Sequence, residues 1–381
     1  MEKIYQKNYS KKEKLERNKE TIDEQLLKHW TKIYFNVSNH IPDSLHHYTS
    51  LSAAKGILDN RELWLSNVKT MNDPDELSYG YRLIALAMEE LVGYASIFGS
   101  HQAKLKNLIE VMKHLAEQKV IIGNAEIYLT CFSAAENTIR QWVTYGDTAA
   151  GVSIKFANKL KKSQNTISKL LTARVNNTDE DDLSNNLKRD VFDVNSLPEE
   201  VKETIKLYEE NYYGFKQVEY VEEKNAKSSN FYINLVSSLD RDLQELFRDQ
   251  KNNDDLDTKS PTEFVDFVCK GAVSRAATSF FIKMALLALS VKHHHWKDEK
   301  EWRLILLMHS PLVNNYNIHF LNKPGALVPF IKYFIQPGDI KEICLGPKTN
   351  KVISHLALDY YSIVNPKYKD LVIIESNIKM A

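Results

Sequence analysis

The chain has 381 residues, in which 50 Lys and Arg balance 50 Asp and Glu, so its formal net charge is zero. This balance excludes the global positive field that attracts nucleic acids or membranes, although a local basic patch is compatible with it. The hydrophobic fraction of 43% is sufficient for one large core or for two domains. The charged N-terminus lacks the apolar segment of a signal peptide, and the most apolar run, 279–291, is too short to cross a bilayer. We therefore expect a cytoplasmic protein that does not enter the membrane.

The cysteines and glycines argue against two common kinds of site. Cys131, Cys269 and Cys344 are far apart, and each lies in an apolar run, as expected of buried thiols in a reducing compartment. The chain contains neither the GxGxxG pattern nor the GxxxxGK[ST] pattern that cradles phosphates. A dinucleotide fold with a glycine-rich loop is therefore not expected.

The first part of the chain alternates strands with helices. Residues 1–40 are predicted to form a helical arm, and residues 41–158 the first half of an α+β core. Residues 45–48 read as a short strand, after which Ser50 or Ser52 caps a helix. Apolar residues at helical spacing predict helices in two further segments, and alternation predicts three further strands. The helices are expected in 71–91 and 105–118, and the strands in 62–67, 126–133 and 150–156.

The second part of the chain is predicted to return to the same core. Residues 159–261 are expected to be a mainly helical insertion, with polar breaks at 175–186 and 248–261 and a further strand near 215–223. Residues 262–381 are expected to supply a long helix, 262–291, and the closing strands of the core. These strands are predicted at 300–308, 328–334 and 342–347. Strands split between the two ends of the chain favour an α+β fold with a mixed or antiparallel sheet.

The segment MNDPDE, 71–76, fits the start of a helix. Asp73 is placed to cap it, Pro74 to occupy its first position, and Glu76 to complete a capping box. The same segment offers three polar groups, Asn72, Asp73 and Glu76, to the wall of a pocket. Both interpretations remain open at this point.

Trp142 and Tyr145 are spaced three residues apart, which places them on one face if the segment is helical. Such a pair usually packs in a core. Its flat rings are also suited to stacking on nicotinamide or adenine.

The segment KHHHWKDEKEWRL, 292–304, is the richest in chemistry. On a strand, only His293 and His295 point the same way, and no further ligands are evident nearby, so we expect no metal site. Glu299 and Glu301 are also two residues apart, and on a strand both carboxylates face one way. Carboxylates at the mouth of a buried strand are candidates for shifted pKa values and for catalysis.

The sequence resembles a large bacterial family of unknown function over about residues 45–350. The resemblance rests on an HYTS motif, an NDPxE motif, a segment that pairs Trp and Tyr ahead of GV.I.F, and an E.EWR motif. The residues that carry it are His47, Tyr48, Thr49 and Ser50; Asn72, Asp73, Pro74 and Glu76; Trp142, Tyr145, Gly151, Val152, Ile154 and Phe156; and Glu299, Glu301, Trp302 and Arg303.

A more distant resemblance is to ADP-ribosyltransferase folds, which show a histidine at a strand end, a central aromatic residue and a late glutamate, often in an ExE pair. It implies NAD as a substrate and Glu301 as the catalytic carboxylate, with Glu299 as its helper. It further implies that His47 holds a ribose hydroxyl and shares a pocket with Glu301 on a neighbouring strand. The remaining cofactor contacts would come from Tyr48, Thr49, Trp142, Tyr145 and Arg303.

The resemblance implies a transferase or NAD glycohydrolase that acts as a toxin or anti-phage effector. Its acceptor, whether protein, nucleic acid or water, and its oligomeric state stay open. One alternative is a metal-assisted nuclease or hydrolase that uses His293, His295, Asp298 and Glu301. Another is a non-enzymatic sensing or scaffold protein that binds a partner through residues 160–290.

Overall fold

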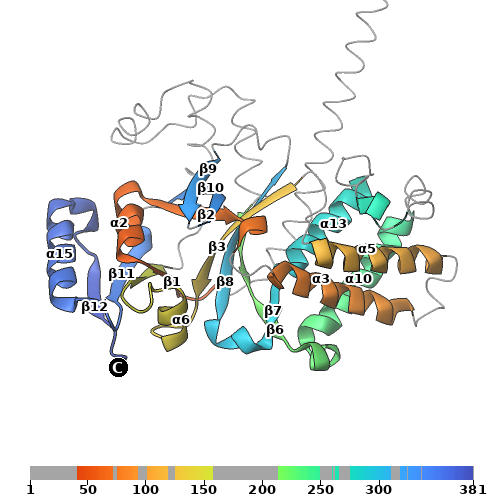
Figure 1. Ribbon diagram of the computed structural model, residues 1–381, viewed down its shortest axis with the longest axis horizontal. Coiled ribbons are helices and arrows are strands. Elements are labelled where there is room, and N and C mark those ends of the chain that lie inside the picture. The colour runs from red at the N-terminus through yellow and green to blue at the C-terminus, as the bar shows by residue number, and fades with distance from the viewer. Residues whose placement is uncertain are drawn as a thin grey trace, which may run out of the picture.

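The computed structural model describes most of the chain outside its N-terminal arm (Figure 1). The described residues are 41–71, 75–92, 101–118, 125–157, 213–248, 260, 262–265, 275–309, 318–323, 325–335 and 337–380. The expected arm, 1–40, and the polar breaks at 175–186 and most of 248–261 lie outside them. None of the described helices is both long enough and apolar enough to span a membrane.

Over the described residues the fold is mixed α and β, built on a ten-stranded, mostly antiparallel sheet. Its strands are β1 (Ser44–Thr49), β2 (Glu62–Asn67), β3 (Ala125–Ser133), β4 (Val152–Ala157), β5 (Tyr213–Gln217), β8 (Glu301–His309), β9 (His319–Lys323), β10 (Ala326–Phe334), β11 (Ile340–Leu345) and β12 (Val372–Glu375). All ladders of this sheet are antiparallel except that between β11 and β12. A second sheet holds β6 (Glu219–Val221) and β7 (Val291–His293) in parallel.

The large sheet divides at β3. Strand β8 pairs with β3 over its whole length, so β1 and β2 share the opposite edge of β3. One branch continues through β1, β4, β11 and β12, and the other through β2, β10 and β9. The sheet is therefore mostly antiparallel and draws its strands from both ends of the chain, as expected.

Most of the described helices lie in two groups, at opposite ends of the molecule (Figure 1). On one side of the figure, α3 (Asp75–Val92), α5 (Gln102–Gln118), α10 (Asn230–Arg248) and α13 (Arg275–Ala288) form a helical group. At the other end lie α2 (Leu51–Asn60) and α15 (Lys351–Val364), and α6 (Ile139–Thr144) lies below β1 and β3. The Ser50 side chain caps α2 by accepting from the backbone N–H of Ala53, as expected.

Residues 213–221 were assigned to a mainly helical insertion, but they are extended. Strand β5 pairs with β8 in the large sheet, and β6 pairs with β7. The strand predicted near 215–223 is therefore present, and this stretch belongs to the core rather than to a helical insertion. The helix expected at 262–291 ends at Ala288, because the chain turns there and pairs as β7.

Gly80 holds α3 close to α13. A Cβ atom added at Gly80 would lie 2.3 Å from Cα and 2.4 Å from the carbonyl oxygen of Ala288, both backbone atoms that cannot rotate away. Gly80→Ala should therefore lower the free energy of unfolding by about 1–3 kcal/mol, despite the better helix propensity of alanine. Gly56 in α2 has no atom within 4 Å of its added Cβ. Gly56→Ala is thus the matched control and should raise the free energy of unfolding by about 0.5–1 kcal/mol. Urea titration of both variants and the wild type measures these changes. Equal stability of Gly80→Ala and Gly56→Ala would contradict the close packing of α3 against α13.

Candidate functional site

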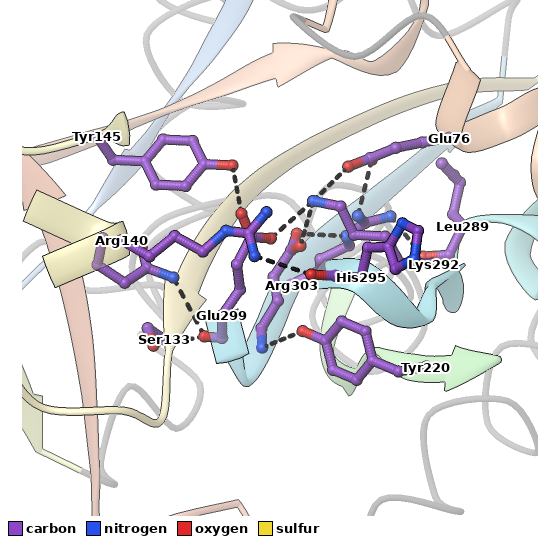
Figure 2. Close-up of polar contacts among 12 residues, drawn as sticks. Glu76, Ser133, Arg140, Tyr145, Tyr220, Leu289, Lys292, His295, Glu299 and Arg303 are labelled. Atoms are coloured by element: carbon purple, nitrogen blue, oxygen red, sulfur yellow. Dashed lines mark hydrogen bonds and ion pairs between the residues drawn. The ribbon is translucent and has the colours of Figure 1, made fainter. Parts of the chain in front are cut away.

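A group of five charged side chains is buried where the sheet meets the helical group (Figure 2). We call Glu76, Lys292, Glu299, Glu301 and Arg303 the ion-pair network; each is at most 7% exposed. The Lys292 ammonium lies 2.8 Å from Glu76, 2.8 Å from Glu299 and 3.2 Å from Glu301. Three carboxylates therefore converge on one lysine.

Arg303 is the second cation of the ion-pair network. Its Nε donates to Glu301 at 2.7 Å, its Nη2 to Glu76 at 2.7 Å, and its Nη1 to the carbonyl oxygen of Leu289 at 2.7 Å. All three guanidinium nitrogens are thus bonded, and the side chain is fully buried. Arg303 is not among the residues that line the pocket described below; its side chain instead fixes the carboxylates of Glu301 and Glu76.

Glu299 and Glu301 were expected on one strand, and this expectation is wrong. Glu299 ends a short 3-10 helix (His294–Glu299), Lys300 adopts a left-handed conformation with φ of 43°, and β8 begins at Glu301. The carboxylates converge nevertheless, because the turn at Lys300 swings Glu299 back over the strand, where its carbonyl oxygen accepts from Ser133 at 2.6 Å.

The two carboxyl groups differ in their electrostatics. Burial raises the pKa of Glu299, and Lys292 only partly offsets this effect. Burial acts in the same direction on Glu301, but Arg303 and Lys292 outweigh it and lower its pKa to about 2. Glu301 is therefore a fixed negative charge, whereas Glu299 holds a proton more tightly than an ordinary glutamate does.

A pocket of about 100 Å³ opens onto both carboxylates. It is lined by His46, His47, Tyr48, Cys131, Phe132, Ser133, Gln141, Tyr145, Glu299 and Glu301. Pockets that bury a drug-sized ligand typically measure roughly 300–1,000 Å³, so this one admits a single ring or a small polar group. Burial and the neighbouring Glu301 raise the pKa of Cys131, which keeps its thiol protonated rather than nucleophilic.

The strand register places His46 on the face of the sheet that carries Glu301, and both His46 and His47 line the pocket. His46 pairs with Ser133, and Ser133 pairs with Glu301, so these three side chains share one face of the sheet. Because successive side chains alternate, His47 projects to the other face, where its ring lies 5.7 Å from that of Phe132. His47 and Glu301 both line the pocket, but the expectation that they lie on neighbouring strands is wrong, since β3 separates the two strands.

Both histidines are neutral near pH 7. Burial lowers the pKa of His46 and that of His47. His47 Nδ1 lies 3.0 Å from the carbonyl oxygen of Cys131, whereas His46 Nδ1 lies 3.5 Å from the Ser153 hydroxyl. His46 is thus the imidazole available on the face that carries the carboxylates.

Trp142 and Tyr145 do not form one stacking surface. Helix α6 ends at Thr144, and Tyr145 leaves the helical path with φ of −120°. Trp142 is fully buried and packs edge-on against Tyr48 at 4.9 Å. Tyr145 is 40% exposed, and its hydroxyl donates to Glu299 at 3.2 Å (Figure 2). Of this aromatic pair, Tyr145 alone reaches the pocket.

The other expected site residues have separate positions. Tyr48 lines the pocket, and its hydroxyl accepts from the backbone N–H of Asn137 at 2.8 Å. Thr49 ends β1 opposite Val152 and is not among the lining residues. Glu76 belongs to the ion-pair network rather than to the pocket wall, and Asn72 and Asp73 lie outside the described residues.

Sequence reasoning missed Lys292, His46, Ser133 and Tyr220. The Tyr220 hydroxyl accepts from the backbone N–H of Glu301 at 2.7 Å, and this contact fixes the start of β8. Nothing in the sequence indicates that Lys292 is buried, because it lies in a segment that contains charges of both signs. His46 had the same local signal as His47, and only the register distinguishes the two residues.

Within the described ranges, no group of three or more His, Cys, Asp or Glu side chains is placed to hold a metal ion. The His293 and His295 rings lie 4.3 Å apart between centroids. Glu301 is bonded to Arg303 and Lys292 and does not join these rings, so the set expected for a metal-assisted hydrolase is not assembled.

A family model described as a protein of unknown function (DUF2971) matches residues 141–304. This span contains Trp142, Tyr145, Lys292 and the segment from Glu299 to Arg303, but not the HYTS or NDPxE motifs. Comparisons with curated proteins and with solved structures gave no match.

Proposed function

We propose that the pocket is the active site of an NAD-cleaving enzyme of the ADP-ribosyltransferase or NAD glycohydrolase class. The observation that carries this proposal is the surplus of negative charge buried at the pocket. Three carboxylates face two cations in the ion-pair network, and two of these carboxylates line the pocket. A buried net charge is costly unless a proton or a cationic group neutralises it. The nicotinamide ring of NAD is a small cation, and its size suits the pocket.

The chemistry assigns a separate role to each carboxylate. Cleavage breaks the bond between the ribose carbon and the nicotinamide nitrogen, and the electron pair leaves with the ring. Positive charge then develops on the ribose, and the fixed carboxylate of Glu301 stabilises it. Glu299, with its raised pKa, accepts the proton of the attacking water or acceptor hydroxyl.

The remaining pocket residues orient the substrate. His46 and Tyr145 line the pocket with the two carboxylates and would hold the ribose and the ring in the geometry needed for cleavage. The rest of the dinucleotide would lie outside the pocket, since its volume of about 100 Å³ is too small for a whole NAD molecule. A cytoplasmic location, where NAD is available, and a role as a toxin or anti-phage effector would follow from this activity.

The direct test is nicotinamide release from NAD by the purified full chain, measured by chromatography. His46→Ala should raise KM by about tenfold, the value of one hydrogen bond of about 1.4 kcal/mol. His47→Ala should change KM less, although His47 also lines the pocket, because His47 Nδ1 already lies 3.0 Å from the carbonyl oxygen of Cys131. A larger effect for His47→Ala would restore the role that the resemblance implies for His47, and the absence of NAD cleavage in all conditions would overturn the proposal.

Tyr145→Phe should shift the pH dependence of the reaction. The tyrosine hydroxyl donates to Glu299 and lowers the pKa of that carboxyl, so its removal should raise this pKa further. Because the base must be ionised, the acidic limb of the kcat/KM profile should move to higher pH. An unchanged acidic limb would remove Glu299 from the proton transfer.

A further inference from the structure

Asn137 lies between the end of β3 and the start of α6, and its backbone adopts the left-handed conformation with φ of 55°. Asparagine enters this conformation more readily than most residues, because its short polar side chain can bond locally. The backbone N–H of Asn137 donates to the hydroxyl of Tyr48 at 2.8 Å, and Tyr48 lines the pocket. The turn at Asn137 therefore holds one residue of the pocket wall directly.

The side-chain amide of Asn137 is bonded at both of its ends. Its Oδ1 accepts from the indole Nε1 of Trp142 at 2.8 Å and from the hydroxyl of Ser376 at 2.6 Å. Its Nδ2 donates to Oδ1 of Asn377 at 2.6 Å. This one side chain thus joins helix α6, which contains Trp142, to the segment 376–378 that follows β12.

Helix α6 depends on contacts of this kind because it is short. It has six residues, and the side chain of Thr138 at its N-cap makes no capping bond. A helix of this length is unstable in isolation, and the missing cap weakens it further. Yet Gln141 of α6 and Tyr145 just after it line the pocket, and they bond to the carbonyl oxygen and the carboxylate of Glu299 at 3.2 Å each. The placement of these two side chains therefore depends on what anchors α6.

The segment 376–378 is itself fixed in the fold. The backbone N–H of Ser376 donates to the carbonyl oxygen of Leu345 at 2.9 Å, and Ser376 is 2% exposed. Ile378 packs against the small buried cluster that contains Tyr48 and Trp142. The segment is therefore held independently of Asn137 and can anchor it.

We propose that Asn137 is a positioning residue of the pocket, and that residues 376–378 anchor it. Asn137 is not among the lining residues, so it acts through Tyr48 and, by way of α6, through Gln141 and Tyr145. The kinetic consequence of this anchoring rests on the proposed function, whereas its effect on α6 does not.

Hydrogen exchange of the full chain tests the anchoring without reference to the reaction. Asn137→Gly keeps the left-handed backbone, which glycine adopts freely, but removes every side-chain bond of Asn137. Amides of α6 should then exchange on the order of tenfold faster, while those of α2 stay unchanged. Arg61→Gly, at another left-handed position with φ of 58°, is the matched control and should leave exchange in α6 unchanged. Unchanged exchange in Asn137→Gly, or equally faster exchange in every helix, would overturn the proposal.

Two further variants separate the parts of this contact. The double variant Ser376→Ala/Asn377→Ala removes the anchor but keeps Asn137, and it should also accelerate exchange in α6. Asn137→Asp keeps an oxygen that accepts from Trp142 and Ser376, so it should restore slow exchange. Wild-type exchange in the double variant would overturn the role of residues 376–378.

The kinetic readout is the KM for NAD in the nicotinamide-release assay. Asn137→Gly should raise KM about tenfold, and Asn137→Asp should restore it. The value of kcat should change less, because the ion-pair network fixes Glu299 and Glu301 without Asn137. Faster exchange in α6 with an unchanged KM would overturn the positioning role. The absence of NAD cleavage in the wild type would overturn the proposed function alone, since hydrogen exchange decides the anchoring separately.

Discussion

Replacing Arg303 with methionine is expected to lower the free energy of unfolding by about 3–5 kcal/mol, the usual cost of removing one partner from a buried ion pair. Arg303 is fully buried and bonds two carboxylates and a backbone carbonyl. Methionine fills most of the volume but leaves Glu76 and Glu301 with Lys292 as their shared cation. This loss of stability should lower the midpoint of urea unfolding, which tryptophan fluorescence can monitor.

Two comparisons separate this effect from a loss of packing. Arg140→Met removes a surface arginine that stacks on Trp296 at 4.3 Å, and it should cost less than about 1 kcal/mol. Adding Glu301→Gln to Arg303→Met should cost less than the sum of the single changes, because the second change removes a charge that the first left unpaired. Additive effects would show that the charges of Arg303 and Glu301 are not coupled.

The same interaction predicts a pH dependence. Glu301 has a folded-state pKa of about 2, below its ordinary value of 4.5, so its contribution to stability is complete above pH 4.5 and is lost as the pH falls towards 2. Arg303→Met should raise this pKa, and acid unfolding should begin at a higher pH than in the wild type.

Glu301→Gln is expected to reduce NAD cleavage by about 100-fold or more, as is typical when a group that stabilises developing charge is removed. Glutamine keeps the shape of the side chain but not the charge that would face the ribose. Glu299→Gln should reduce the rate less, because the role proposed for Glu299 is to accept the proton of the attacking water or acceptor hydroxyl. Nicotinamide release under saturating NAD measures both variants.

The fold of each variant needs a control, since both residues lie in the ion-pair network. Thermal unfolding of each variant should be recorded with the activity, and Glu110→Gln, at an exposed position of α5, should leave the rate unchanged. Toxicity on expression that Glu301→Gln relieves would support the same conclusion. Full activity in Glu301→Gln with none in Glu299→Gln would reverse the two roles, and full activity in both would remove the carboxylates from the reaction.

Local patterns predicted most of the individual elements. Alternation placed β2, β3, β4 and β8 within one or two residues, and the cap at Ser50 was identified from its own segment. These features depend on neighbours in the sequence, because strand alternation and capping are decided within a few residues. The errors arose at junctions: the turn at Lys300 and the end of α6 before Tyr145 each broke a local period.

The sequence by itself determined which segments are extended, which are helical and which short segments carry unusual chemistry, since these follow from short-range periodicity. Only the tertiary structure decided that His46 lies on the face of the sheet that carries Glu301, because that placement depends on the register between β1 and β3, which are separated by a long stretch of chain. It also decided that Lys292 is buried among three carboxylates. A lysine in a charged segment is ordinarily solvated, and burial of its charge becomes favourable only when residues distant in sequence surround it with compensating charge.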